Sequence, residues 1–181
     1  MNWITREYGS DHEKIEVLIL EEPMENTLVG MISSDLFEEK IAIAFDCQKQ
    51  LDYDFACLGM MYDGSKPRIY MEQELVGRLK KESDEANLIL FHEIGHYIHK
   101  DYSKNISDLE RERAVQTGCV IEKELFADDF AASYIGKNAV IHGLKILAER
   151  MKAKYQSGVD EVSISLALLE IELRIKHQIA K

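Results

Sequence analysis

The most informative segment of the sequence is Leu88-Ile89-Leu90-Phe91-His92-Glu93-Ile94-Gly95-His96-Tyr97-Ile98-His99. His92 and His96 have the i, i+4 spacing that puts two side chains on one face of a helix, about one turn apart. Two imidazoles in this arrangement can bind the same Zn²⁺ ion, each at roughly 2.0–2.1 Å. Glu93 projects about 100° around the helix from His92, where its carboxylate can reach a metal-bound water without ligating the metal. The segment therefore predicts a metal-binding helix with an adjacent general base.

The surroundings of the motif predict that this helix is buried. Two histidines and a glutamate are costly to bury without partners, and one metal ion satisfies all three. In a chain with 6 His among 181 residues, HExxH is expected by accident about 2% of the time. The alternative interpretation is a pair of core histidines that are hydrogen-bonded without a metal. The apolar residues around the motif are Ile89, Leu90, Phe91, Ile94 and Ile98.

A catalytic zinc site of this type needs a third protein ligand. An extended histidine motif would put Gly at position 99 and His at position 102, but the sequence has His99 and Tyr102, which excludes that class. His99 is expected to be a partly exposed polar residue, too far along the helix axis to be an obvious ligand. The remaining source of a ligand is a glutamate on a later helix.

Helical geometry separates the acidic residues of the segment Glu122–Ala132 into those on an apolar face and those on the solvent side. Asp128 lies about 40° from Glu124, on a largely apolar face, whereas Glu122 and Asp129 lie about 140–160° away, on the solvent side. Buried carboxylates need a cation or hydrogen-bond donors. We therefore expect Glu124 to be the third metal ligand and Asp128 to orient a ligand histidine. The alternative is an amphipathic helix whose charges only line its edge.

Together, His92-Glu93-Ile94-Gly95-His96-Tyr97-Ile98-His99 and Glu124-x-x-Ala127-Asp128-x-Phe130-Ala131 resemble the ImmA/IrrE-type metallopeptidases of bacteria and their mobile elements. The resemblance covers roughly residues 55–135. It implies a minimal gluzincin fold and a zinc-dependent endopeptidase with one Zn²⁺ per chain. It also implies a narrow protein substrate, typically a helix-turn-helix repressor, supplied by another chain.

The expected mechanism follows from these residues. Zn²⁺ held by His92, His96 and Glu124 keeps a fourth position for water, and Glu93 accepts the proton of that water and passes it to the leaving amine. An additional donor is expected to stabilise the oxyanion, and the candidates are Tyr134, His142 and Tyr155.

Composition and charge narrow the function classes. The length of 181 residues suits a single domain, and the net charge of −11 argues against nucleic-acid or anionic-membrane partners. No spanning helix or signal peptide is recognisable. Cys47, Cys57 and Cys119 form no CxxC pair and are expected to be reduced, buried thiols, which predicts a cytoplasmic protein.

Two further functions remain open from the sequence. One is a zincin-fold binding or sensing module with a structural zinc, against which the intact Glu93 argues. The other is a DNA-associated protease, which the acidic charge disfavours.

The pattern along the chain predicts an α+β protein of residues 1–181, strand-rich over 1–75 and helical over 83–181. Strands are expected at Lys14–Leu20 and Thr27–Ser33, and a hairpin at Phe55–Tyr62 and Pro67–Met71 with its turn at Asp63–Lys66 and Pro67 on an edge strand. Residues 34–51 are ambiguous between a helix and a buried strand at Ile41–Phe45, and the spacing of Leu36, Ile41, Ala44, Gln48 and Leu51 favours the helix. Helices are expected from Ser83, as the N-cap, to Lys100, over Val120–Ile135 with a stop at Gly136, and over Ala139–Gln156 and Asp160–Ile179. The apolar residues of the last of these helices are expected to form core or a helix–helix contact (Ile164, Leu168, Ile171 and Ile175).

Overall fold

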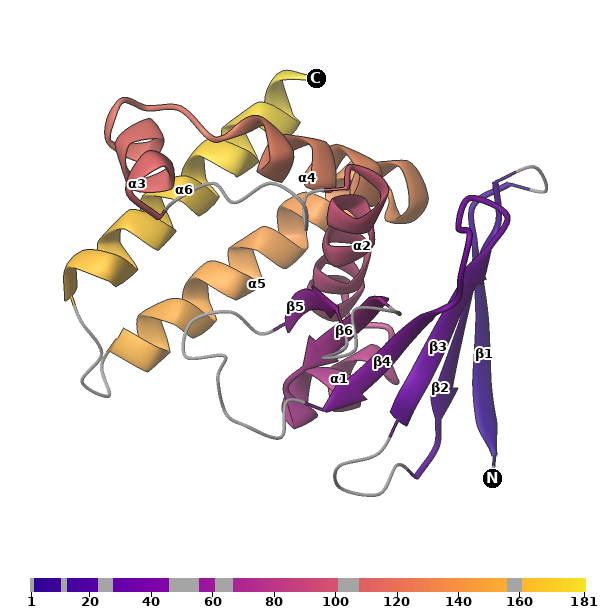
Figure 1. Cartoon of the computed structure of the whole chain (residues 1–181). Helices are drawn as coiled ribbons and strands as arrows, with labels where there is room; N and C mark the ends of the chain where they lie inside the picture. The colour runs from indigo at the N-terminus through magenta and orange to yellow at the C-terminus, as the bar shows by residue number, and fades with distance from the viewer. Residues whose placement is uncertain are drawn as a thin grey trace.

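Strands occupy the N-terminal part of the chain and helices the C-terminal part (Figure 1). The computed structural model describes residues 2–10, 13–22, 28–45, 56–60, 67–100, 108–155 and 161–181. The strands are β1 (Trp3–Tyr8), β2 (Ile15–Leu20), β3 (Leu28–Ser34), β4 (Ile41–Phe45), β5 (Ala56–Met60) and β6 (Pro67–Met71). The helices are α1 (Gln73–Leu79), α2 (Asp84–Ile98), α3 (Asp108–Gln116), α4 (Glu122–Ile135), α5 (Lys137–Tyr155) and α6 (Glu161–Ala180). The predicted α+β class is confirmed.

The described strands form one sheet in the order β1-β2-β3-β4-β6-β5. Neighbouring strands are antiparallel except β4 and β6, which are parallel. Alternate residues of β2 (Ile15, Val17 and Ile19) are fully buried, because successive side chains of a strand point to opposite faces. The strands predicted at Lys14–Leu20 and Thr27–Ser33 are therefore confirmed as β2 and β3.

The preference for a helix after Ser34 is wrong where the structure describes that segment. Ile41–Phe45 is strand β4, which pairs with β3 on one side and β6 on the other. Ile41 and Ile43 of this inner strand are completely buried, and β-branched residues pack well on such a surface. Ser34 stabilises a turn instead of a helix, since its Oγ accepts a hydrogen bond from the amide of Leu36 at 3.2 Å. Residues 46–51 lie outside the described ranges.

The predicted hairpin strands are confirmed, but the edge position of Pro67 is wrong. β5 and β6 pair in antiparallel register from Ala56↔Met71 to Met60↔Pro67, and the turn at residues 61–66 lies outside the described ranges. β6 is an inner strand between β4 and β5. Pro67 is tolerated because it is the first residue of β6 and precedes the pairing with β4, which begins at Arg68.

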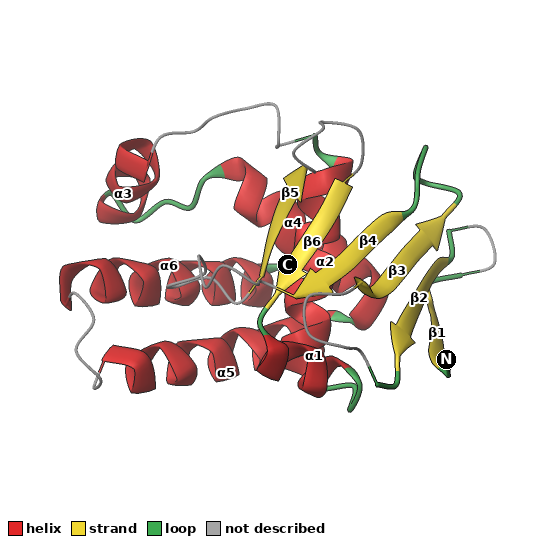
Figure 2. Ribbon diagram, turned by 60° about the horizontal axis from the view of Figure 1, so that its bottom comes forward, coloured by secondary structure: helices red, strands yellow, loops and turns green. Residues whose placement is uncertain are grey.

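Helix α2 is central to the helical half of the molecule. It contacts α4, α5, β5 and β6, and Figure 2 shows α5 and α6 side by side on the far side of α2 from the sheet. Of the four apolar residues predicted for α6, Ile164 and Ile171 are buried, and Leu168 and Ile175 are partly buried. The other predicted helices are confirmed within a few residues as α2, α4, α5 and α6, whereas α1 and α3 were not predicted as separate helices. Among the described helices, none is long and apolar enough to cross a membrane.

The predicted burial of the cysteines is wrong for Cys119, which is a free thiol on the surface. The side chains of Cys47 and Cys57 lie outside the description.

Candidate metal centre

Helix α2 carries both histidines of the HExxH motif. Its N-terminus is capped as predicted, because the Ser83 Oγ accepts a hydrogen bond from the amide of Ala86 at 3.2 Å. The helix continues without interruption to Ile98. His92 and His96 consequently lie on one face, with ring centroids 4.6 Å apart and the rings nearly perpendicular.

Helix α4 crosses α2 closely at Gly95. A Cβ added to Gly95 would lie 2.7 Å from the Cα of Ala127 and 3.2 Å from its Cβ, so this approach requires a glycine. Ala127 is itself small and fully buried. Glu124 and Asp128 lie within one turn of Ala127 on α4, and the close crossing therefore brings both carboxylates to the histidines.

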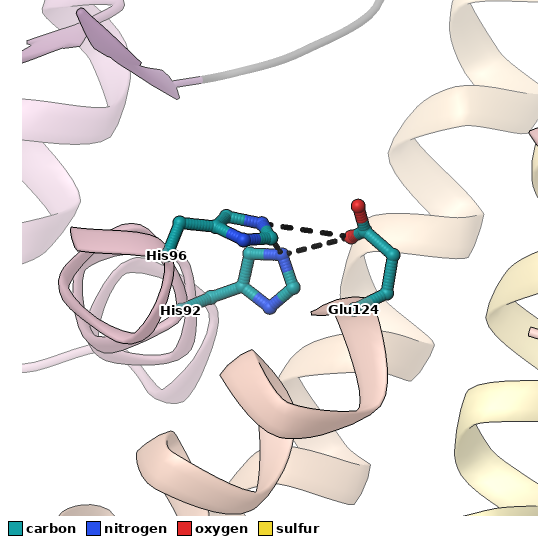
Figure 3. A group of neighbouring side chains, drawn as sticks. All are labelled: His92, His96 and Glu124. Atoms are coloured by element: carbon teal, nitrogen blue, oxygen red, sulfur yellow. Dashed lines mark hydrogen bonds and ion pairs between the residues drawn. The ribbon is translucent and has the colours of Figure 1, made fainter. Parts of the chain in front are cut away.

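Three ligand-type atoms converge between the two helices (Figure 3). The Nε2 atoms of His92 and His96 are 3.0 Å apart. The Oε2 atom of Glu124 lies 3.1 Å from Nε2 of His92 and 3.7 Å from Nε2 of His96. His92 and Glu124 are buried and His96 is partly exposed. The three residues predicted as metal ligands are thus brought together, and they form a group that could hold a metal ion.

The size of this triangle fits a small divalent cation. The circle through atoms separated by 3.0, 3.1 and 3.7 Å has a radius of about 1.9 Å, close to the zinc–ligand bond lengths of about 2.0–2.2 Å for imidazole nitrogen and carboxylate oxygen. With both imidazoles neutral, the three atoms could all offer lone pairs to the space between them. Such a cluster is stable when a cation, either a proton or a metal ion, lies among them.

The other nitrogen of His92 faces a second set of charges. Its Nδ1 lies 2.9 Å from Oδ1 of Asp128. Arg174 of α6 donates from Nε to Oδ2 of Asp128 at 2.7 Å and from Nη2 to Oδ1 at 2.6 Å. Asp128 is completely buried and Arg174 almost so. The contact expected between Asp128 and a ligand histidine is therefore present, and it includes a buried arginine that was not predicted.

The electrostatics of the cluster favour positive charge at His92. Burial and the Arg174 guanidinium oppose its protonation, but hydrogen bonds to Asp128 and Glu124 outweigh them and raise the pKa of His92 to about 9. Burial also opposes ionisation of Glu124, yet the hydrogen bonds from His92 and His96 hold the pKa of its carboxyl well below the ordinary value. Against the same effect of burial, the Arg174 charge holds the pKa of Asp128 below its usual range. Both carboxylates are consequently ionised at neutral pH.

Glu93 follows His92 on α2 and is half-buried, and its predicted role as general base stays a prediction. The predicted oxyanion donors are less well placed. The Tyr134 ring stacks on Phe91, on a different face of α2, and His142 is an exposed residue paired with Asp84 at the N-terminus of α2. Neither lies with the converging atoms, and the side chain of Tyr155 lies outside the description.

His99 is partly exposed, as expected. Its ring stacks on Phe126 of α4, with centroids 4.6 Å apart. The group of converging ligand atoms consists of His92, His96 and Glu124 and does not include His99, within the part of the chain that the structure describes.

The roles of Gly95 and Arg174 in this centre were not predicted from the sequence. Gly95 lies inside the motif, and a glycine within a buried helical pattern is a recognisable signal of close helix packing. Arg174 lies four residues after Glu170 on the stripe of α6 that also contains Gln178, and all three are buried. A polar i, i+4, i+8 stripe beside an apolar one could have indicated a buried charge network, but not its partner.

Comparisons of the whole chain with models of protein families, with curated proteins and with solved structures found no match.

Proposed function

We propose that this protein is a zinc-dependent endopeptidase with a minimal zincin fold of the gluzincin type. His92, His96 and Glu124 are the metal ligands in this proposal, and Glu93 is the general base. The observation that carries it is the convergence of two imidazole nitrogens and one carboxylate oxygen, 3.0 to 3.7 Å apart.

The donor set favours zinc. Two imidazoles and one carboxylate are a combination that zinc uses in hydrolytic sites, where three protein ligands leave one position open. His96 is the most exposed of the three ligand side chains, at 13%, against 10% for His92 and 5% for Glu124. The open side of the centre is therefore expected near His96. When bound, zinc acidifies a water molecule and polarises a substrate carbonyl.

The role of Glu93 is to move a proton. Its half-buried carboxylate accepts a proton from the attacking water and then delivers it to the nitrogen of the leaving amine. Asp128 accepts the Nδ1 hydrogen of His92, which leaves Nε2 of the same ring for the metal. Glu93 thus transfers the proton, while the imidazole of His92 binds the metal.

The position of β5 supports a peptide as the substrate. β5 is the last strand of the described sheet on the side of β6, and it contacts α2. An extended peptide can add to such an edge through main-chain hydrogen bonds, which would hold it beside the metal helix. By resemblance, the substrate is an intracellular protein such as a helix-turn-helix transcriptional repressor.

Metal content and cleavage together test the proposal. Purified wild-type protein is expected to contain about one zinc per chain and His96→Ala and Glu124→Ala to lose it. Glu93→Gln is expected to keep its zinc but to lose cleavage of a co-expressed repressor by about 10²-fold or more. Absence of zinc after reconstitution would refute the proposal. Zinc binding without cleavage of any neighbouring repressor or peptide library would instead favour a binding module with a structural zinc.

A further inference from the structure

The buried contact between α4 and α6 carries a role beyond the ligands themselves. We propose that Arg174 is a positioning residue of the metal centre, which holds Asp128 in the one orientation that leaves Nε2 of His92 available to a metal. This inference rests on the proposed function, because it concerns the same site. Its test is chosen so that the two can fail separately.

The guanidinium of Arg174 holds both oxygens of Asp128. Nε donates to Oδ2 at 2.7 Å and Nη2 donates to Oδ1 at 2.6 Å. A planar guanidinium offers these donors in a rigid fork, so a carboxylate bound to it cannot rotate about its own axis without breaking a charge-assisted hydrogen bond. Lysine, with one ammonium, cannot hold both oxygens in this way. The orientation of Asp128 is consequently set by α6 and not by α4 alone.

This orientation decides which nitrogen of His92 carries a hydrogen. Oδ1 of Asp128 lies 2.9 Å from Nδ1, and Nη2 of Arg174 lies 3.1 Å from the same nitrogen. Since a guanidinium cannot accept a hydrogen bond, the Nδ1 hydrogen goes to Oδ1, which receives the Nη2 hydrogen as well. Once His92 is neutral, Nε2 then presents its lone pair toward Glu124 and His96. Without the fork, Nδ1 could accept from another donor, and a hydrogen on Nε2 would block the metal.

A second buried carboxylate, that of Glu170, attracts the charge of Arg174. Glu170, one turn earlier on α6, is buried and accepts a hydrogen bond from Nε of Arg111 on α3 at 2.8 Å. Charges therefore alternate from Arg111 to Glu170 to Arg174 to Asp128, and the series ends at His92. Burial of the guanidinium, which would be costly alone, is offset by its two hydrogen bonds to Asp128 and by the charge of Glu170. Helix α6 thus belongs to the metal centre, although it supplies no ligand.

The test compares Arg174→Lys, which keeps the charge but loses the fork, with Lys176→Gln on the same helix. Lys176 is exposed and pairs only with Glu172 in the described contacts, so its loss removes a charge without touching the centre. Zinc affinity is measured by competition with a chromophoric chelator, and the state of the His92 Nδ1 atom by ¹⁵N NMR of the zinc-bound form. Arg174→Lys is expected to bind zinc about 10–100-fold more weakly, with a changed ¹⁵N shift of the His92 Nδ1 atom in the zinc-bound form, while Lys176→Gln matches the wild type.

A second variant covers a failure of Arg174→Lys to fold. The double variant Asp128→Asn with Arg174→Gln removes both buried charges together, so neither remains uncompensated. It is expected to fold and to bind zinc as weakly as Asp128→Asn alone, because a residue that acts only through Asp128 adds nothing once that carboxylate is replaced. A folded variant that binds zinc as tightly as the wild type overturns the inference, as does failure of both variants to fold, which would make Arg174 a folding residue only.

The outcomes separate this inference from the proposed peptidase. If the wild type binds zinc and Arg174→Lys binds it weakly, the inference is supported even if no peptide is cleaved, although the peptidase is then refuted. If both proteins bind zinc equally and cleavage is found, only the inference is overturned. A wild type that binds no zinc overturns both.

Discussion

Gly95→Ala is the most direct perturbation of the centre that replaces none of the proposed ligands. One methyl group is added where α2 and α4 cross. It would lie 2.7 Å from the Cα of Ala127, and a normal carbon contact requires that distance to lengthen by about 0.7 Å or more. Because the contact atom belongs to the backbone, no side-chain rotation relieves it. The two helices must therefore separate.

The expected magnitude follows from the geometry and from a matched control. Overpacking of this kind costs about 1–3 kcal/mol, whereas alanine in place of a helical glycine gains up to about 1 kcal/mol. Gly77→Ala isolates the gain, because a Cβ at this α1 position meets nothing within 4 Å. The free energy of unfolding of Gly95→Ala should therefore lie about 1–3 kcal/mol below that of Gly77→Ala. Separation of the helices would also stretch the 3.1 and 3.7 Å distances from Glu124 to the two imidazoles. We expect zinc affinity to fall at least about tenfold, or about 1.4 kcal/mol.

Urea unfolding of the zinc-free proteins and chelator competition on the folded proteins measure the two effects separately. Gly77→Ala should be as stable as the wild type or more stable, and its zinc affinity should not change. If Gly95→Ala matched Gly77→Ala in both measurements, the close crossing would not be what sets the spacing of the ligands.

Three other predictions concern protons, buried charge and the start of α2. Zinc affinity should rise about tenfold per pH unit from about pH 6 to about pH 8, because the pKa of His92 is raised to about 9 in the zinc-free protein and its Nε2 proton must leave when the metal binds. An affinity that does not change over this range would contradict a proton on Nε2 of His92. Glu85 is fully buried and accepts hydrogen bonds from Arg78 at 3.0 Å and Arg150 at 2.7 Å. Glu85→Gln should therefore lower the free energy of unfolding in urea by about 3 kcal/mol or more. Glu74 is an exposed partner of Arg78, and Glu74→Gln should cost less than about 1 kcal/mol. Equal losses in the two variants would argue against a buried charge network. Ser83→Ala should lower the free energy of unfolding by about 1 kcal/mol through loss of the helix cap, and an unchanged urea midpoint would show that the cap contributes nothing.

Parts of the fold that depend on local pattern could be predicted. α2 was expected because Ser83 is a good cap and apolar residues follow on all sides, and α4 was expected to end at Gly136, which lies at its C-cap with φ 85°. The alternation of apolar residues over β2 is also a local pattern, and it indicated a strand. Residues 41–45 were misassigned because a short apolar run suits a buried helix as well as an inner strand. The choice between helix and strand is decided by pairing with β3 and β6, two strands that are far apart in the sequence.

The sequence by itself determined the spacing of His92 and His96 and the shared face of Glu124 and Asp128, because each pair lies within one turn of a single helix. Tertiary structure alone decided that the two faces meet. The crossing at Gly95 puts α4 within reach of α2, and Arg174 arrives from a helix about eighty residues away in sequence to hold Asp128. Helical periodicity is a property of neighbours along the chain, whereas the partner of a buried charge is chosen by packing and by the cost of leaving it unpaired.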